Sequence, residues 1–290
     1  MGELSFHGVD VGLFEGGEDL VRRLLEADAE IQDDDVLVVS SKIVSLAEGR
    51  YVDLESVPVS ARAERVARVT GIDEREVELI LRDSRILGTI PVAEFVGERL
   101  EEYAADPENA TAALEELPSL LLAERDGQIC TNAGVDLSNS PQGVATLLPA
   151  DPDASARRIR EELEERADLE VAVVLADSEV SYRGGSVDVA IGCSGIDFVD
   201  RNFGATDLFG TPKLGGVDLI ADELAAGAAL LSGQADERTP IVVVRGLEYD
   251  AGEGVPGQTG LVRNGLASTA VRSLWVKLTE KISVPLLGDR

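Results

Sequence analysis

The sequence has few of the residues that build zinc sites and disulfides. Its 290 residues include one histidine (His7) and two cysteines (Cys130 and Cys193). A lone histidine near the N-terminus argues against histidine-based nucleophilic catalysis and against a zinc site. The cysteines have no metal-ligand spacing and give no disulfide framework, so we expect small, partly buried side chains. A reactive role for Cys130 is the less favoured alternative.

Long hydrophobic runs and basic surfaces are also missing. No apolar run reaches membrane-spanning length, and the N-terminus lacks the basic and then apolar pattern of a signal peptide. We therefore expect a cytoplasmic protein that makes no membrane contact. Lysine occurs only at positions 42, 213, 277 and 281, and no basic face is visible. Binding to nucleic-acid phosphates is consequently not expected.

Acidic residues, in contrast, are abundant from one end of the chain to the other. Asp and Glu number 55 against 26 Lys and Arg, which gives a net charge of −29. A uniformly acidic, lysine-poor composition is typical of halophilic proteins, because salt screens the self-repulsion of a highly charged surface. The alternative is an acidic protein that binds a partner, although such proteins usually concentrate their charge.

Alternating strand and helix patterns predict an α/β fold with mixed buried sheets. Apolar, β-branched runs predict strands at residues 34–39, 169–176, 187–191 and 241–244. Helical patterns cover residues 20–27, 43–50, 59–70, 73–83, 153–165, 217–231 and 269–282. Gly71 is a helix stop signal, Asp153 is a candidate N-cap, and residues 192–195 should form a turn.

We expect one α/β domain over residues 1–250. The acidic stretch at residues 88–118 predicts a helical surface insertion, interrupted at Asp106-Pro107. Residues 251–290, a Gly-rich segment and a final helix, are assigned to the same domain. No Gly-x-Gly-x-x-Gly follows a strand, so a Rossmann cofactor site is not supported.

An acid flanked by two asparagines stands in the polar segment at residues 132–139. Small polar side chains around Gly134 suit a functional loop on a rigid scaffold. Asp136 and its neighbours could hold a hard cation and a phosphate together. Taken alone, the segment is more simply interpreted as an Asx-rich turn that satisfies its own backbone.

Two further segments offer oxygen ligands. Asp177 and Ser178 follow a predicted buried strand, which should end at Asp177, and Gln234 lies between a helix and a strand. With Asp136 they form an all-oxygen set, which suits Mg²⁺ or Mn²⁺ better than zinc. Two cations that bridge nucleotide phosphates would offset charge and orient an in-line attack. These residues form one site only if the three segments converge.

Several ordered motifs cover residues 34–247: SSKIVS at 40–45, NAGVD at 132–136, SN at 138–139, DS at 177–178, DLFG at 207–210, ADELA at 221–225 and VVVRGL at 242–247. Their order and spacing resemble the coenzyme F420-0:L-glutamate ligases. That resemblance implies an α/β fold with two subdomains and a homodimer. It also implies a reaction that joins L-glutamate to coenzyme F420-0 with GTP and divalent metal. The acidic composition favours a haloarchaeal member of this family.

Carried onto this sequence, the resemblance implies that Asp136 and Asp177 are catalytic and bind a first metal ion. Ser178 and Gln234 would bind a second. The residues that would contact GTP are Ser41, Lys42, Asn139, Gly233 and Gln234. The ions would be Mg²⁺ or Mn²⁺, and K⁺ is also compatible with the family. The implied mechanism activates the coenzyme carboxylate as an acyl phosphate, which the glutamate amine then attacks.

The sequence departs from the family pattern at three places. Leu46 stands where the family usually has a lysine that contacts GTP. Residues 8–13 lack the proline of the family's nucleotide loop, and residues 179–183 replace a Gly-Arg-Pro-like loop, with Arg183 kept. Losing a cation that faces phosphate should weaken nucleotide binding unless Lys42 or an arginine compensates. The alternative functions are a divergent paralogue that binds without ligase activity, or a ligase for another acid.

Overall fold

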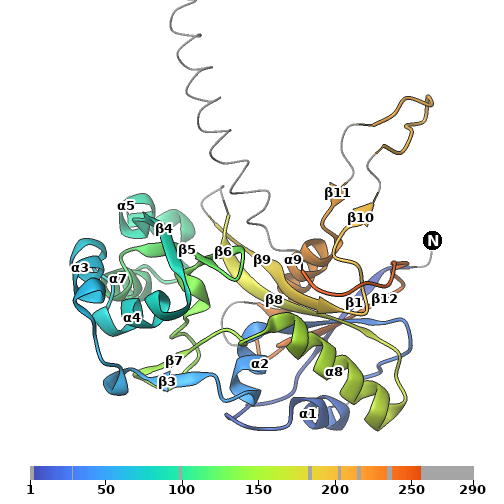
Figure 1. Cartoon of the computed structure of the whole chain (residues 1–290), viewed down its shortest axis with the longest axis horizontal. Coiled ribbons are helices and arrows are strands. Elements are labelled where there is room, and N and C mark those ends of the chain that lie inside the picture. Colours follow the sequence, from blue (N-terminus) through green and yellow to red (C-terminus); the bar gives the residue numbers. More distant parts are fainter. Residues whose placement is uncertain are drawn as a thin grey trace, which may run out of the picture.

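A five-stranded mixed sheet forms the centre of the molecule (Figure 1). The computed structural model describes residues 3–27, 29–97, 100–181, 185–201, 204–213, 217–233 and 237–255. In the order β1-β12-β2-β8-β9, the sheet contains β1 (Ser5–Val9), β12 (Ile241–Arg245), β2 (Val36–Ser40), β8 (Ala172–Val180) and β9 (Ser186–Ser194). β2 and β8 are parallel, and the other neighbours are antiparallel. The predicted α/β fold is confirmed, although β1 was not predicted.

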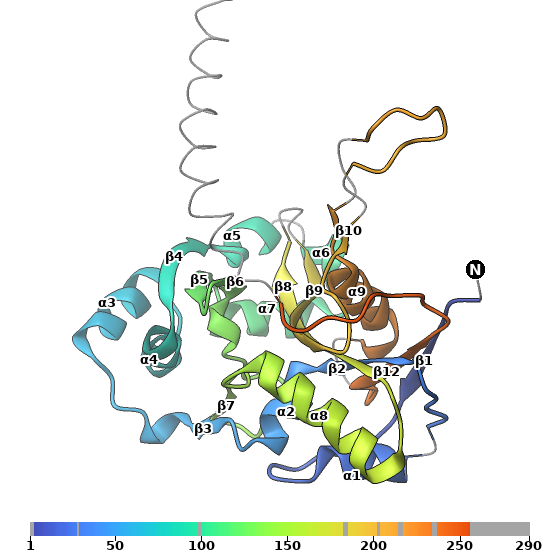
Figure 2. The ribbon, with the colours of Figure 1, turned by 45° about the vertical axis from the view of Figure 1, so that its right-hand side comes forward.

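Both faces of this sheet are buried, because its central strands are apolar at consecutive positions. One face, with Leu37 and Val173, packs against α1 (Leu20–Glu26), α2 (Ser41–Ala47) and α8 (Pro152–Ala167). The other face, with Val38 and Val174, packs against α9 (Ile220–Ser232). Figure 2 shows α8 and α9 on different sides of the strands. The sheet is therefore a rigid base for the side chains at the ends of its strands.

A second hydrophobic core lies beside the central sheet, on the left in Figure 1. It joins α3 (Ala61–Thr70) and α4 (Glu74–Asp83) to a sheet of β4 (Arg85–Ile90), β5 (Leu120–Arg125) and β6 (Gln128–Thr131). β3 (Tyr51–Asp53) pairs with β7 (Val144–Thr146). Val77 and Ile80 are fully buried here. Gly71 ends α3 at φ 77°, as its sequence position predicts.

Residues 88–118 are not helical throughout. Residues 88–90 belong to β4, which pairs with β5 as the edge strand of the second sheet. The helical prediction is wrong there, because an edge strand with one face exposed lacks a continuous apolar run. The helices of this stretch are α5 (Val92–Val96), α6 (Leu100–Tyr103) and α7 (Pro107–Glu116). Asp106 is the N-cap of α7.

Two strands extend further than their apolar patterns predict. β8 continues through Asp177 and Ser178 to Val180, and β9 continues to Ser194, so neither the strand end at Asp177 nor the turn at 192–195 is correct. The polar ends of the two strands pair with each other, which satisfies their backbones. The N-cap of α8 is Asp151, whose carboxylate accepts from the Ala154 N–H at 3.0 Å, rather than Asp153.

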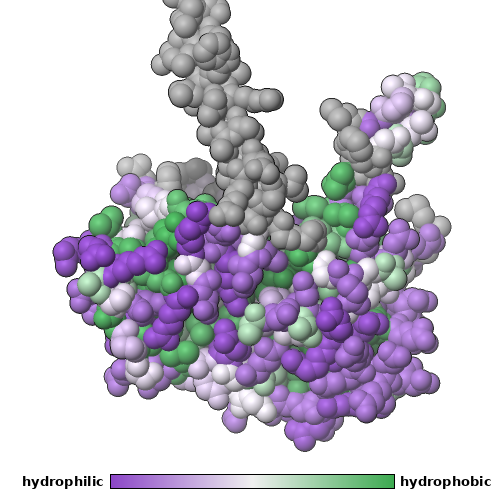
Figure 3. Space-filling model, in the orientation of Figure 1, coloured by the Kyte–Doolittle hydropathy of each residue, from purple (hydrophilic) through white to green (hydrophobic). Residues whose placement is uncertain are grey.

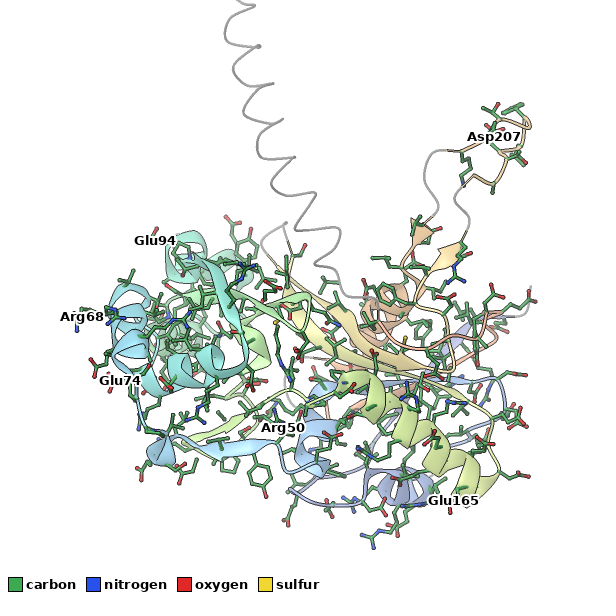
Figure 4. All side chains as sticks on the ribbon, viewed as in Figure 1. Arg50, Arg68, Glu74, Glu94, Glu165 and Asp207 are labelled. Atoms are coloured by element: carbon green, nitrogen blue, oxygen red, sulfur yellow. The ribbon has the colours of Figure 1, made fainter. Side chains whose placement is uncertain are left out.

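The hairpin of β10 (Asp200–Arg201) and β11 (Val217–Asp218) carries a segment that projects from the body, with Asp207 near its tip (Figure 4). The sequence pattern places Val217 in the helix at 217–231. In the structure Val217 lies in the short strand β11, and α9 begins at Ile220. Cys130 and Cys193 are both buried and unpaired. None of the described helices is long and apolar enough to cross a membrane. The helix predicted at 269–282 lies outside the described residues.

Candidate active site

The strand order brings several chain segments to one edge of the central sheet. β1, β2 and β8 run toward this edge, and β12 and β9 begin there. In open α/β sheets, ligand sites form outside the carboxyl ends of parallel strands. Ser41 follows β2 directly, and Asp177 lies in the last half of β8. The edge therefore collects residues that the sequence placed in separate motifs.

Ser41 and Lys42 begin α2, and each contacts a different predicted metal ligand. The Ser41 hydroxyl donates to Asp177 Oδ1 at 2.5 Å. The Lys42 ammonium forms an ion pair with the Asp136 carboxylate, and it also donates to the Ser138 carbonyl and hydroxyl oxygens. Because these contacts start from adjacent residues, Asp136 and Asp177 belong to one site.

The segment at residues 132–139 is ordered by its own polar side chains. The Ser138 N–H and hydroxyl donate to the Asp136 carboxylate at 2.7 and 3.0 Å, so the Asx-type turn does form. Asn132 is buried, and its Oδ1 accepts from the Leu121 N–H at 2.7 Å, which ties the segment to β5. Asn139 is exposed at φ 47°. The segment is thus both a self-satisfied turn and the carrier of Asp136.

Gly134 is required by the packing of this segment. Its φ is 69°, and a Cβ there would overlap the side chain of Leu148 at 2.1 Å. No other residue type combines this backbone conformation with so close a contact. The close approach fixes the turn against the chain that leads into α8.

Asp177 is a half-buried carboxylate among other acids. The pKa of Asp177 is raised to about 7, mainly by burial and in smaller part by the charges of Asp136 and Asp188, while the Ser41 hydrogen bond and Lys42 act in the opposite direction. Three carboxylates thus share the neighbourhood of one ammonium group. A divalent cation at this position would relieve the repulsion between the acids.

Asp188 belongs to this site, although no motif indicated it. It lies opposite Ser178 in the β8–β9 ladder, and the Ser178 hydroxyl donates to Asp188 Oδ1 at 2.6 Å. The sequence signal was the alternation Val187-Asp188-Val189, in which a polar residue between two valines faces the other side of a strand.

Glu179 is a second carboxylate that no sequence motif indicated. Its Oε2 accepts from both the N–H and the hydroxyl of Thr131, at 2.6 Å each. Burial raises the pKa of Glu179 to about 8, although the Thr131 hydrogen bonds oppose this effect. The sequence pattern assigns Glu179 to a loop, because it predicts that β8 ends at Asp177. In the structure it lies on the strand, two residues beyond Asp177.

Not every predicted residue can be placed at this edge. Gln234 and Arg183 lie outside the described residues. Gly233 ends α9 at φ 66° and ψ −171°, a conformation that only glycine adopts readily. Leu46 lies one turn after Lys42 on the same face of α2. This face therefore presents one cation and one apolar side chain, where the family resemblance implies two cations.

The oxygen donors at this edge fit a hard divalent cation that a substrate helps to hold. Among the described residues, no three His, Cys, Asp or Glu side chains converge closely enough to enclose a metal ion by themselves. Mg²⁺ in phosphate-binding sites usually takes one or two carboxylates and completes its shell with water and substrate phosphates. Asp136 and Asp177, with the hydroxyl of Ser41, are a donor set of that kind, whereas the Ser178 hydroxyl bonds to Asp188.

Comparison with known proteins finds relatives along most of the chain. The family model described as F420-0:Gamma-glutamyl ligase matches residues 8–246. The coenzyme F420:L-glutamate ligase of Methanopyrus kandleri is 35% identical over 252 residues, which cover 86% of this chain and 89% of the relative. The proteins of that name in Halorubrum lacusprofundi and Natronomonas pharaonis are 36% and 40% identical. Their alignments cover 88% and 79% of this chain, and 92% and 80% of the relatives.

Proposed function

The chain belongs to the F420-0:gamma-glutamyl ligase family, and from this premise we propose that it joins L-glutamate to the carboxylate of coenzyme F420-0 through an amide bond. We further propose that GTP activates the carboxylate and that a divalent metal assists. One observation carries the proposal: adjacent residues of α2 contact both predicted metal ligands, Ser41 to Asp177 and Lys42 to Asp136.

In the proposed reaction, a carboxylate oxygen of the coenzyme attacks the γ-phosphorus of GTP, and GDP leaves. The amine of L-glutamate then attacks the acyl carbon, phosphate leaves with the electron pair of the C–O bond, and the amine loses one proton. A bound Mg²⁺ or Mn²⁺ would neutralise the charge on the phosphoryl oxygens.

The described residues have distinct roles in this proposal. Asp136 and Asp177 would hold the metal, and Ser178 would contribute to a second metal position with Gln234. Ser41 holds Asp177 by donating to Oδ1, and the other carboxylate oxygen would be the one to bind the cation. When GTP binds, the Lys42 ammonium group would leave Asp136 and pair with a phosphate of GTP.

The direct test incubates the purified protein with GTP, Mn²⁺, L-glutamate and coenzyme F420-0 in high salt, and measures GDP and glutamylated coenzyme. We expect both products in equal amounts. Absence of both would contradict the proposal and favour a paralogue that binds without turnover. GDP release that requires a different acid would retain the ligase chemistry but change its substrate.

Lys42→Met is expected to change metal and nucleotide binding in opposite directions. The ammonium group neutralises Asp136, so its loss should tighten Mn²⁺ binding in the absence of GTP. The same loss should weaken GTP binding by roughly 10- to 100-fold, since a hydrogen bond to a charged group contributes about 1.5–3 kcal/mol. Mn²⁺ titration followed by electron paramagnetic resonance, and the KM for GTP, measure the two effects.

Lys213→Met provides the matched control for Lys42→Met, because Lys213 is an exposed lysine on the projecting segment. It should leave both constants unchanged. Weaker Mn²⁺ binding by Lys42→Met would show that Lys42 supports the metal site and does not compete for it.

We also propose that the protein is halophilic. Its net charge of −29 produces strong self-repulsion at low ionic strength, and Figure 3 shows hydrophilic residues over much of the visible face. The midpoint of thermal unfolding should therefore rise from dilute buffer to molar KCl. A midpoint that falls or stays constant would contradict this adaptation.

A further inference from the structure

The end of β6 is attached to the far end of β8 by side-chain hydrogen bonds that no sequence motif indicates. Thr131 donates twice to Glu179 Oε2, from its N–H and from its hydroxyl, at 2.6 Å each. The Thr131 hydroxyl oxygen in turn accepts from the Val180 N–H at 3.2 Å. Three hydrogen bonds therefore join one residue of β6 to two consecutive residues of β8.

Both partners stand beside a proposed metal ligand in the chain. Thr131 directly precedes the segment at residues 132–139, which carries Asp136. Glu179 lies two residues after Asp177 on the same strand, so both side chains project from the same face of β8, roughly 7 Å apart along it. The contact is thus well placed to set the position of Asp136 relative to Asp177.

A gain in folding stability does not explain this contact. Glu179 Oε1 is buried and has no hydrogen-bond partner among the described residues. An unsatisfied buried acceptor is destabilising, whereas an apolar pair of similar shape can be neutral or stabilising. A carboxyl at this place is therefore better explained by what it positions than by what it stabilises.

We propose that Glu179 and Thr131 are a positioning pair that holds the Asp136 segment beside Asp177 in the arrangement that binds divalent metal. This inference rests on the proposed function. Thr131 is the residue that precedes Asn132, so the pair holds the backbone that leads into the Asp136 segment. In this proposal neither residue contacts the metal or the substrates. Its loss should consequently affect metal affinity first and coenzyme affinity little.

Thr131→Val and Thr131→Ser test the pair. Valine keeps the shape of threonine but removes the hydroxyl that bonds to Glu179 and Val180, and serine retains it. We measure Mn²⁺ binding without substrates by electron paramagnetic resonance, the KM for coenzyme F420-0, and the thermal midpoint. Thr131→Val should weaken Mn²⁺ binding by about 10-fold, the lower end for supporting residues of metal sites. Thr131→Ser should restore wild-type binding, and neither variant should change the KM for the coenzyme.

The outcomes separate this inference from the proposed function. If wild-type protein fails to bind Mn²⁺, or if Asp177→Asn binds it normally, both the proposed metal site and the pair are refuted. If wild type binds Mn²⁺ and Thr131→Val binds equally well, only the pair is refuted. Should Thr131→Val fail to fold, Glu179→Leu replaces it, because leucine occupies similar space but has no oxygen to accept the two hydrogen bonds from Thr131. Wild-type Mn²⁺ affinity in Glu179→Leu would then overturn the pair.

Discussion

Asp177→Asn is expected to reduce kcat by roughly 10³-fold or more while leaving the protein folded. Asparagine has the same shape, and its side-chain oxygen can still accept the hydrogen bond from Ser41. What it lacks is the negative charge that the proposed metal site needs. Metal stabilisation of a phosphoryl transition state is worth several kcal/mol, and about 4 kcal/mol corresponds to a rate factor of about 10³.

The same substitution at Asp168 is the control for Asp177→Asn. Asp168 is the C-cap of α8 in a left-handed conformation, which asparagine adopts readily, so Asp168→Asn should keep full activity. Initial rates of GDP release at saturating Mn²⁺ give the comparison. Turnover by Asp177→Asn within about 10-fold of wild type, less than 1.4 kcal/mol in barrier height, would refute its assignment as a metal ligand.

The regular elements could be predicted because their signals are local. Gly71 stops α3 through its left-handed conformation, and the apolar run in β2 is long enough to identify a buried strand. β8 shows where local signals fail: the apolar run ends at Ala176, yet the strand continues to Val180. Its polar half is stabilised by pairing with β9, and no local pattern reveals which partner a strand will find.

The candidate site could be predicted as a set of residue types but not as an arrangement. The motifs at Asp136 and Asp177 indicate hard oxygen ligands through their residue types alone. Their convergence depends on β2 and β8 being neighbours and on Lys42 reaching Asp136, which are non-local facts. Asp188 and Glu179 were missed for the same reason, since both act through non-local contacts: Asp188 through the pairing of β9 with β8, and Glu179 through a side-chain contact with Thr131 of β6 in the other sheet.

Glu76→Gln is expected to stabilise the protein at pH 8 by about 3 kcal/mol, the free-energy equivalent of its pKa shift. Glu76 lies in α4 and is only 4% exposed. Its pKa is raised from 4.5 to about 7, mainly by burial and in smaller part by the charges of Asp73 and Asp136. Its nearest described partner is the Asn132 amide, at a long 3.4 Å. The ionised carboxylate is therefore poorly compensated in the folded state.

The sign of the pH dependence follows from this raised pKa. The folded protein binds the Glu76 proton more tightly than the unfolded chain, so stability is fully present below pH 4.5 and is lost as the pH rises through about 7. Glutamine does not ionise, and the difference between variant and wild type should open mainly between pH 5 and 7. Urea unfolding in high salt at these two pH values and at pH 8 measures it.

Glu165→Gln serves as the control for Glu76→Gln, because Glu165 is an exposed acid on α8 (Figure 4). It removes one negative charge without relieving burial, so it should give no comparable pH-dependent gain.

The activity of Glu76→Gln is a second measurement of the role of Glu76. Glu76 does not hold the Asp136 segment through its charge, since Asn132 also binds the Leu121 N–H at 2.7 Å. Glu76→Gln should therefore gain stability while kcat stays within about 2-fold, a barrier change near 0.4 kcal/mol. A large loss of kcat would instead place the ionised Glu76 among the groups that set the charge around Asp136.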